Sequence, residues 1–422
     1  MNKSKLKKYL PSKKAAKDSA TTLTGDFISK GFLFFVNLIL MKVSTQEEFA
    51  LFSIYITFLG LGQQFSDLGI NQGIIKYYSA YKNDDINKAN AFLSFGFKFK
   101  LISAFLFALV YLILSYPTAV YGYKQATHIM PLMIAAVGTF GGSMVDYIQA
   151  LFQSKQDYKK LAVIKVTEGF VKLGGLLLLV LIREYSIDKV YWIYSIVPLL
   201  VFLLGYNMGK PLKCEYNPKE IFSELFNFSK WIFLAGLTTM IMVRIDILML
   251  SFLSSKDLAG LGIYSAGIKL CVPLQVAAAS MNTVFFPKAM EIRKRSEIKS
   301  FIFSTLKITL PLSLGFVIFS ILVEVFLPYI FPNYIASLSI FHILVIAFLF
   351  NLLGNPITVI LLAINKQKVA LKINIIQLFV NILANLILFH YFNNIGIALG
   401  TLVTYLIGGF LTFYYIYRYL KK

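Results

Sequence analysis

Twelve apolar stretches, each long enough to cross a lipid bilayer, divide this chain of 422 residues. A membrane-spanning helix needs about 20 mainly apolar residues to cross roughly 30 Å of hydrocarbon. The stretches occupy residues 24–43, 49–72, 90–115, 127–150, 160–182, 190–208, 230–253, 258–286, 301–327, 336–363, 369–391 and 395–417. Because they use most of the chain, the sequence predicts an all-α integral membrane protein with twelve transmembrane helices and no sizeable soluble domain.

The lysine and arginine residues between these stretches alternate in number from loop to loop. The N-terminal tail, the five even-numbered loops and the C-terminus together hold 29 of them. The odd-numbered loops hold only Lys42, Lys124, Arg183, Lys189 and Lys256. Short cytoplasmic loops of membrane proteins carry an excess of cations. The distribution therefore predicts a multi-pass protein whose two termini are both cytoplasmic.

The composition excludes a water-soluble fold. Apolar residues make up 58% of the chain, and its mean hydropathy is +0.71. A net charge of +21 is a common property of nucleic-acid-binding proteins, but here the cations lie along one membrane face. We therefore expect lipid of the cytoplasmic leaflet as their partner and no nucleic acid. The first 22 residues are basic and polar, without the apolar segment of a signal peptide.

The longest inner connection, Asn207 to Lys230, lies at the midpoint of the chain and separates two halves of six stretches each. Within it, Pro218 predicts a helix start. Two apolar pairs follow at a spacing of four residues, Ile221/Leu225 and Phe222/Phe226. This spacing is typical of an amphipathic helix that lies in the membrane interface. We expect an N-terminal lobe over residues 1–208 and a C-terminal lobe, which begins with this helix, over residues 209–422.

The two halves resemble each other as repeats. A shift of 212 residues places Phe52-Ser53 on Tyr264-Ser265, and a shift of 211 places Lys155-Gln156 on Lys366-Gln367. An even number of spans in each half makes the repeat parallel, with a pseudo-twofold axis along the membrane normal. Transporters built from such repeats place the substrate site at the repeat interface.

Charged residues inside the apolar stretches are the strongest indication of function. Each central Lys, Arg or Asp costs roughly 3 kcal/mol to insert, so it needs a partner or a wet cavity. The cations are Lys30, Lys98, Lys100, Lys172, Arg244, Lys269 and Lys307. The acids are Asp26, Asp67, Asp146, Glu168, Asp246 and Glu324. So many charges favour a polar interior cavity over a simple membrane anchor.

Position along the stretch separates these residues into groups. Lys172, Arg244 and Lys269 lie near mid-membrane, where a lysine or arginine cannot easily reach the surface, so cavity lining is favoured for them. Lys98, Lys100 and Lys307 lie nearer the cytoplasmic ends, where snorkelling to the surface explains them as well as cavity lining does. Asp67, Asp146 and Glu324 lie near helix ends, where a helix cap or an ion pair explains them better than cavity lining does.

Two further patterns each have two explanations. Asp26 and Lys30, like Glu168 and Lys172, are four residues apart on one helix face, so each pair either neutralises itself or lines a cavity. An amide stripe in the eleventh stretch, which also either faces a cavity or joins helices, consists of Asn374, Gln377, Asn381 and Asn385.

The sequence gives no sign of an enzyme. Its three histidines are scattered without metal-ligand spacing, and no Gly-rich loop ends in Lys-Ser or Lys-Thr as a nucleotide-binding loop does. We therefore expect no catalytic residues, no metal site and no cofactor.

Several segments make the chain similar to the bacterial polysaccharide-transporter family, the Wzx-type flippases of lipid-linked oligosaccharides that are related to multidrug and toxic compound extrusion (MATE) exporters. The segments are Phe27-Ile28-Ser29-Lys30-Gly31-Phe32, Glu47-Glu48-Phe49-Ala50-Leu51-Phe52-Ser53, Phe65-Ser66-Asp67-Leu68-Gly69-Ile70, Arg244-Ile245-Asp246-Ile247-Leu248-Met249-Leu250 and Gly262-Ile263-Tyr264-Ser265-Ala266-Gly267-Ile268-Lys269-Leu270. Ala50 stands where the family pattern carries glycine. The resemblance runs over nearly the whole chain, although its motifs are loose.

The resemblance implies two six-helix lobes around a V-shaped central cavity that opens alternately to each side of the bacterial inner membrane. It implies that cavity cations hold the pyrophosphate of a polyprenyl-linked oligosaccharide, of O-antigen or capsule type, while it is moved to the outer leaflet. The candidates for substrate binding are Lys30, Lys172, Arg244 and Lys269, with Gln377 and Asn381 for sugar hydroxyls. The candidates for coupling to an ion gradient are Asp26, Glu168 and Asp246.

Four other functions compete with this reading. A MATE-like drug or cation exporter would favour unpaired acids, and here the central charges are mostly basic. The lipid II flippase branch adds two helices after the twelfth, whereas this sequence has twelve apolar stretches. A glycosyltransferase or polymerase needs a large outer loop for its catalytic residues, whereas the outer loops here are short. A major-facilitator transporter would carry an Asp-Arg-rich turn between the second and third spans, and this sequence has no such turn.

A polysaccharide flippase would have a polymerase and chain-length machinery as further partners.

Overall fold

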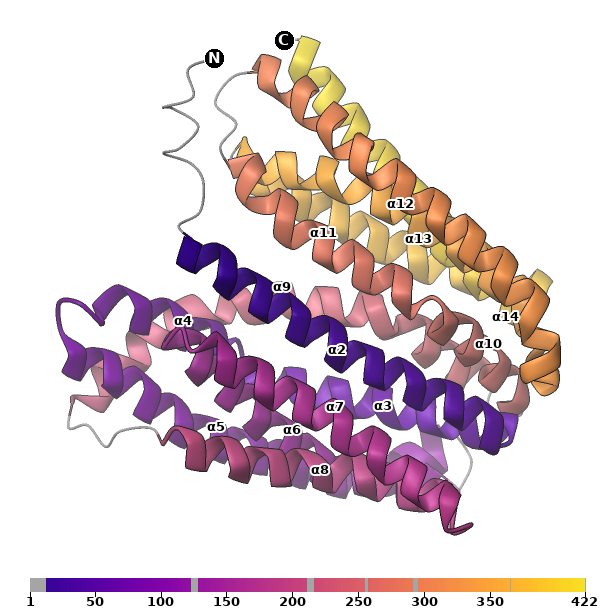
Figure 1. Cartoon of the computed structure of the whole chain (residues 1–422), viewed down its shortest axis with the longest axis horizontal. Helices are drawn as coiled ribbons and strands as arrows, with labels where there is room; N and C mark the ends of the chain where they lie inside the picture. The colour runs from indigo at the N-terminus through magenta and orange to yellow at the C-terminus, as the bar shows by residue number, and fades with distance from the viewer. Residues whose placement is uncertain are drawn as a thin grey trace. The chain divides into compact units, whose positions relative to one another are not determined.

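The structure, a computed structural model, describes residues 13–122, 128–210, 216–254, 257–290, 295–364 and 366–421 (Figure 1). The lysines of the N-terminal tail before residue 13 lie outside these ranges. Within them every element is helical, which confirms the predicted all-α class. The longer elements are α2 (Lys13–Val43), α3 (Gln46–Asp67), α4 (Ile70–Tyr81), α5 (Ile86–Pro117), α6 (Ile129–Ser154), α7 (Tyr158–Leu181), α8 (Ile187–Met208), α9 (Pro218–Leu253), α10 (Leu258–Leu270), α11 (Val272–Met290), α12 (Arg295–Ile330), α13 (Ser337–Ala363) and α14 (Gln367–Lys421).

Every predicted apolar stretch falls on one or two of these helices. By length and composition, nine helices of the described ranges can cross a membrane, or ten if α10 and α11, bent by 41° between them, form one span. α7 is outside this set because even its most apolar part carries Lys165, Glu168 and Lys172. The chain is therefore a multi-pass membrane protein, and the number of twelve spans stays a prediction.

The last helix, α14, contains two of the predicted spans. A straight helix of its 55 residues would extend about 80 Å, more than twice the thickness of the hydrocarbon core. Asn393 breaks the helix with a φ of 48° and a ψ of −131°. The side-chain amide of Gln377 donates to the Thr404 carbonyl across the break, at 3.3 Å. The two arms of α14 therefore pack against each other as a hairpin, in agreement with the predicted stretches 369–391 and 395–417.

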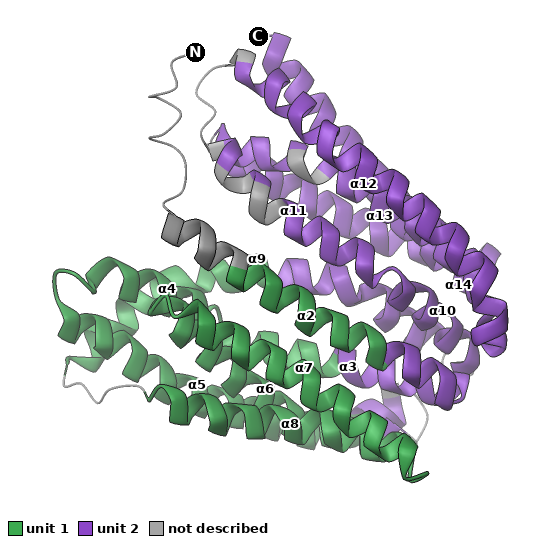
Figure 2. Ribbon diagram, in the orientation of Figure 1, with its two compact units in different colours: residues 1–36, 58–117, 129–236 green, residues 37–57, 118–128, 237–422 purple. Residues whose placement is uncertain are grey.

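The chain forms two compact units that do not follow a single cut (Figure 2). Unit 1 comprises residues 1–36, 58–117 and 129–236, and unit 2 comprises residues 37–57, 118–128 and 237–422. The first turns of α9 thus group with the first unit, and the α2–α3 turn groups with the second. The lobe boundary between residues 208 and 209 stays a prediction.

The predicted interfacial helix is the beginning of α9, and it continues without a break into the following span. It starts at Pro218 as expected, but its two apolar pairs lie in different surroundings. Ile221 and Leu225 are buried in the core of unit 1, whereas Phe222 and Phe226 are 42% and 46% exposed. One apolar face therefore packs on protein and the other is left for lipid.

Ion pairs hold the beginning of α9 on unit 1. The Lys88 ammonium on α5 lies 2.8 Å from Glu220 and 2.7 Å from Glu224. The Tyr77 hydroxyl on α4 donates to the Glu224 carbonyl at 2.9 Å. These contacts join α4, α5 and α9 at the end of the unit that we predict to be cytoplasmic.

In unit 2 the turn between α2 and α3 packs on the loop between α12 and α13. The Lys42 ammonium donates to the Ile330 carbonyl at 2.8 Å, and the Tyr334 hydroxyl donates to the Thr45 carbonyl at 3.4 Å. Burial raises the pKa of Tyr334 to about 12. A methyl group at Gly262 of α10 would lie 2.0 Å from the Gln46 carbonyl oxygen.

We predict that Gly262→Ala destabilises the protein, because the Gln46 backbone would have to move. Overpacking of this kind costs about 1–3 kcal/mol, which exceeds the gain of about 1 kcal/mol that alanine gives inside a helix. Gly315→Ala in α12 is the matched control, since a methyl group there meets nothing within 4 Å. Thermal unfolding in detergent should show a lower midpoint for Gly262→Ala only. Equal midpoints for the two variants would contradict this packing.

Candidate functional site

Within unit 1, the buried cations of the predicted spans are paired with acids. The Lys100 ammonium is fully buried and lies 2.8 Å from Asp67. Lys172 lies 2.5 Å from Glu168, one turn away on α7, and 4.9 Å from the centre of the Tyr194 ring. The i,i+4 pair predicted on α7 is therefore present.

Asp26 is paired with a different cation from the one its spacing suggests. Its carboxylate lies 2.6 Å from Lys165 on α7 rather than bonding to Lys30, one turn away on α2. Lys30 and Lys98 are exposed. The coupling candidates Asp26 and Glu168 thus both have a cationic partner, and Lys30 is not tied to an acid within the described ranges.

We predict that Lys100→Met costs about 3 kcal/mol of stability, because it leaves the Asp67 carboxylate without its partner. The double variant Lys100→Met/Asp67→Leu should regain most of this loss, since neither member of the pair is then left charged without the other. A double-mutant cycle on thermal unfolding midpoints measures the difference. If the double variant were as unstable as the two single losses added together, the pair would not be the reason for the effect.

Within unit 2, Asp246 on α9 is the centre of a buried polar cluster, which we call the Asp246 cluster. Its carboxylate accepts hydrogen bonds from the Tyr264 hydroxyl at 2.9 Å, the Asn385 amide at 2.9 Å and the Thr401 hydroxyl at 2.6 Å. The Asn385 amide also donates to the Asn381 side-chain oxygen at 3.2 Å. All five side chains are buried. The cluster joins α9, α10 and both arms of α14 around one carboxylate.

The chemistry of the Asp246 cluster suits a small cation. The side chains that hydrogen-bond to the carboxylate are all neutral, and no cation pairs with it in the described part of the chain. The Asn385 side-chain oxygen is buried without a hydrogen-bond partner among the described residues. A buried carboxylate without a counter-ion favours uptake of a proton or a hard cation. Carboxylate, amide and hydroxyl oxygens are the donors that such a cation prefers.

Two cavities of unit 2 adjoin this cluster. One of about 380 Å³ is lined by Asp246, Asn381 and Thr401, and one of about 240 Å³ is lined by Asn374 and Gln377. They share five lining residues, namely Thr239, Met242, Val243, Asn351 and Tyr405. The amide stripe therefore serves both roles that the sequence left open: Asn385 and Gln377 join helices, and Asn374, Gln377 and Asn381 line cavities.

Arg244 and Lys269 form a pair of cations in unit 2 without a compensating acid. They carry like charges and lie on the consecutive helices α9 and α10. Neither forms an ion pair within the described ranges. The Arg244 Nε atom is buried and has no hydrogen-bond partner among the described residues. Two unpaired cations at this depth are a candidate anion site.

The other charges of unit 2 lie at the surface. Lys307 on α12 is exposed. The carboxylate of Glu324 is 59% exposed and lies 3.7 Å from His342. Sequence reasoning did not identify Tyr264 or Thr401 as partners of Asp246, because they lie 18 and 155 residues away from it. Within the described ranges no group of three His, Cys, Asp or Glu side chains could hold a metal ion.

The sequence pattern of the family described as "Polysaccharide biosynthesis protein" matches residues 15–293, more than half of the chain. The chain belongs to this family. The predicted family membership is therefore confirmed, and the matched residues include Arg244, Asp246 and Lys269. No curated protein sequence matches significantly.

Solved structures show the fold of this family member. A lipid II flippase MurJ in an inward closed conformation has a TM-score of 0.76 at 16% identity, over 94% of this chain and 87% of that one. An inward-facing multidrug resistance MATE transporter of the MOP superfamily has a TM-score of 0.76 at 12% identity, over 96% and 98%. A mutant form of the Vibrio cholerae MATE transporter VcmN has a TM-score of 0.66 at 16% identity, over 97% of each chain. The MATE-like fold is thus confirmed.

Proposed function

We propose that this protein is a flippase that moves a polyprenyl-pyrophosphate-linked oligosaccharide from the cytoplasmic to the outer leaflet of the bacterial inner membrane, with both termini cytoplasmic. It acts as a transporter and not as an enzyme. The observation that carries the proposal is the pair Arg244 and Lys269, which are mid-span cations without an acid in the described ranges. A diphosphate crossing hydrocarbon needs such compensation, because an uncompensated charge there costs several kcal/mol.

The sugars of the substrate need neutral hydrogen-bonding partners. The cavities of unit 2 offer amides and hydroxyls, among them Asn374, Gln377 and Asn351, together with the Tyr405 ring. Aromatic side chains and a few polar groups are the usual lining of small-ligand sites. Gln377 and Asn381 therefore remain our candidates for sugar contacts, and Lys30 and Lys172 remain candidates for the diphosphate at another stage of transport.

The Asp246 cluster is our candidate for ion coupling, in preference to Asp26 and Glu168. Those two acids already have lysine partners, whereas Asp246 is held by neutral donors. Binding of a proton or monovalent cation would neutralise the carboxylate and weaken its hold on Tyr264 and on both arms of α14. A cation gradient could then bias two arrangements of unit 2.

Deletion of the gene in its host tests the proposal. We expect surface polysaccharide to disappear and the polyprenyl-linked repeat unit to accumulate on the cytoplasmic side. The wild-type chain should restore the polymer, and the Arg244→Ala and Lys269→Ala variants should not. Normal surface polysaccharide in the deletion strain would contradict a flippase.

A cation exporter is the second candidate, because a buried acid among neutral donors also suits a cationic drug and the fold is shared with MATE transporters. The same deletion strain distinguishes the two functions. New sensitivity to lipophilic cations together with intact surface polysaccharide would establish the exporter in place of the flippase.

A further inference from the structure

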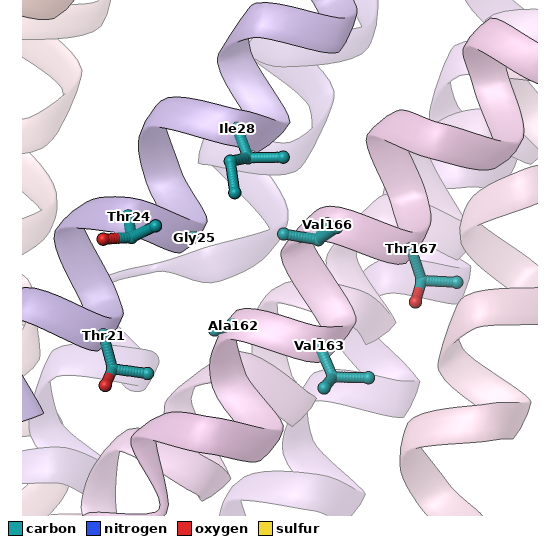
Figure 3. A pocket seen from close by; sticks show the side chains of 8 residues that line it. All are labelled: Thr21, Thr24, Gly25, Ile28, Ala162, Val163, Val166 and Thr167. Carbon is teal, nitrogen blue, oxygen red and sulfur yellow. The ribbon is translucent and has the colours of Figure 1, made fainter.

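A groove on unit 1 lies between the beginnings of α2 and α7, and none of its lining residues is one that the proposed function uses. Its volume is about 540 Å³. Four of its lining residues, Thr21, Thr24, Gly25 and Ile28, come from α2, and four, Ala162, Val163, Val166 and Thr167, come from α7. Ile28 and Val166 point toward each other across the gap between the helices (Figure 3). The lining is apolar apart from threonine hydroxyls, which hydrogen-bond readily within their own helix.

Close packing and an ion pair hold α2 and α7 together beside the groove, so the groove is part of the folded unit. A methyl group at Gly25 would lie 2.8 Å from the Ala162 Cβ atom, which shows how closely the backbones approach. The Asp26–Lys165 ion pair joins the helices beside this contact at 2.6 Å. Ile28 and Val163 are nevertheless 39% and 46% exposed. The close approach thus leaves an open apolar groove beside it.

Both walls lie at the predicted cytoplasmic edge of the hydrocarbon. The α2 wall runs over the eight residues from Thr21 to Ile28, which is about 10 Å along a helix. An apolar groove at this depth is filled by hydrocarbon chain, since an empty space would forfeit its van der Waals contacts. A chain that enters from the inner leaflet would place its headgroup one helical turn beyond Val163.

The charge at that position is positive. Lys159 lies four residues before Val163 on the same face of α7 and is exposed. It forms no ion pair with any acid whose side chain the structure describes, whereas its neighbour Lys160 is bound to Asp157 at 3.2 Å. Among the side chains that the structure describes, the acid beside the groove is Asp26, and Lys165 neutralises it. Of these side chains, a phosphate would therefore meet one uncompensated cation and no uncompensated anion.

We propose that this groove is a binding site for one acyl chain of an anionic phospholipid of the cytoplasmic leaflet, with the lipid phosphate at Lys159. The lipid would hold α2 and α7 together at their open end. The site is independent of substrate transport, so it can be present whether or not the protein is a flippase.

The test is photo-crosslinking of the full-length protein in vesicles of phosphatidylcholine with a minor fraction of phosphatidylglycerol. A diazirine-bearing acyl chain is carried in one set by phosphatidylglycerol and in the other by phosphatidylcholine. We expect adducts on peptides covering residues 21–28 and 159–167, about fivefold more with phosphatidylglycerol, the ratio for about 1 kcal/mol from one lysine near the surface. Lys159→Gln should remove this preference, and Val163→Trp should remove the adducts.

Matched variants keep the result specific. Leu181→Trp places the same ring at an exposed site of α7 outside the groove, and Lys98→Gln removes an exposed lysine of α5; neither should change the adducts. Equal labelling by the two lipids, or unchanged labelling of Val163→Trp, would overturn the proposal. Displacement of the label by polyprenyl phosphate but not by excess phosphatidylglycerol would overturn it as well, because the groove would then hold the substrate chain.

Discussion

The double variant Arg244→Gln/Lys269→Gln is expected to bind polyprenyl pyrophosphate at least about a hundredfold more weakly than the wild-type protein. Hydrogen bonds to charged groups contribute about 1.5–3 kcal/mol each, so the loss of two corresponds to this factor or more. Each single variant should lose about tenfold. The measurement is an equilibrium binding titration of the purified variants with a short-chain polyprenyl pyrophosphate in detergent.

The thermal stability of the variants distinguishes an anion-binding role of Arg244 and Lys269 from a structural one. Arg244 and Lys269 carry like charges and have no acid partner in the described ranges, so their removal should leave the thermal midpoint unchanged or raise it. Lys98→Gln and Lys307→Gln remove exposed lysines of other spans and should change binding less than twofold, as surface charges contribute only about 0–1 kcal/mol. A double variant that unfolds early, or one that binds normally, would show that the two cations are not the anion site.

Asp246→Asn is expected to uncouple transport from the ion gradient with little change in the fold. Asparagine keeps the size of the side chain and one acceptor oxygen, so Tyr264 and Thr401 retain a partner. The charge that would take up a cation is lost, and a coupling free energy of about 1–3 kcal/mol, at least about fivefold in rate, is lost with it. Transport by reconstituted protein with and without an imposed proton or sodium gradient measures the effect.

Glu324→Gln is the matched control, because this acid lies in another helix and its side chain is 59% exposed. It should respond to the gradient as the wild-type protein does. Downhill exchange without a gradient should persist in Asp246→Asn, since the pair Arg244 and Lys269 is untouched. A full gradient response of Asp246→Asn would remove the Asp246 cluster from the mechanism and return Asp26 and Glu168 as candidates.

The helices could be predicted from the sequence because the bilayer imposes their length and the backbone must be satisfied within each of them. The hairpin of α14 illustrates this, since its two apolar stretches are separate in the sequence although the helix is nearly continuous around Asn393. The beginning of α9 was harder to place. Its two apolar pairs look alike in the sequence, and only the packing on α4 and α5 buries Ile221 and Leu225 and leaves Phe222 and Phe226 exposed.

At the candidate site too, contacts within one helix could be predicted from the sequence, whereas contacts between distant residues could not. The Glu168–Lys172 pair follows from the helical repeat, but Asp26 bonds to Lys165, 139 residues away. The Asp246 cluster combines three helices, and the positions of Tyr264 and Thr401 in the sequence give no hint of it. Arg244 and Lys269 were singled out by depth alone, because a central cation costs too much to be accidental.

Transport of a fluorescent polyprenyl-pyrophosphate-linked disaccharide by the purified protein in liposomes tests the central claim most directly. A membrane-impermeant quencher reports the fraction in the outer leaflet over time. We predict that wild-type protein equilibrates the lipid between leaflets and that Arg244→Gln/Lys269→Gln does not exceed protein-free liposomes. The flippase proposal would be contradicted if the wild-type protein left this lipid in its original leaflet. Transport of a lipophilic cation by the same liposomes, driven by an ion gradient, would then favour the exporter.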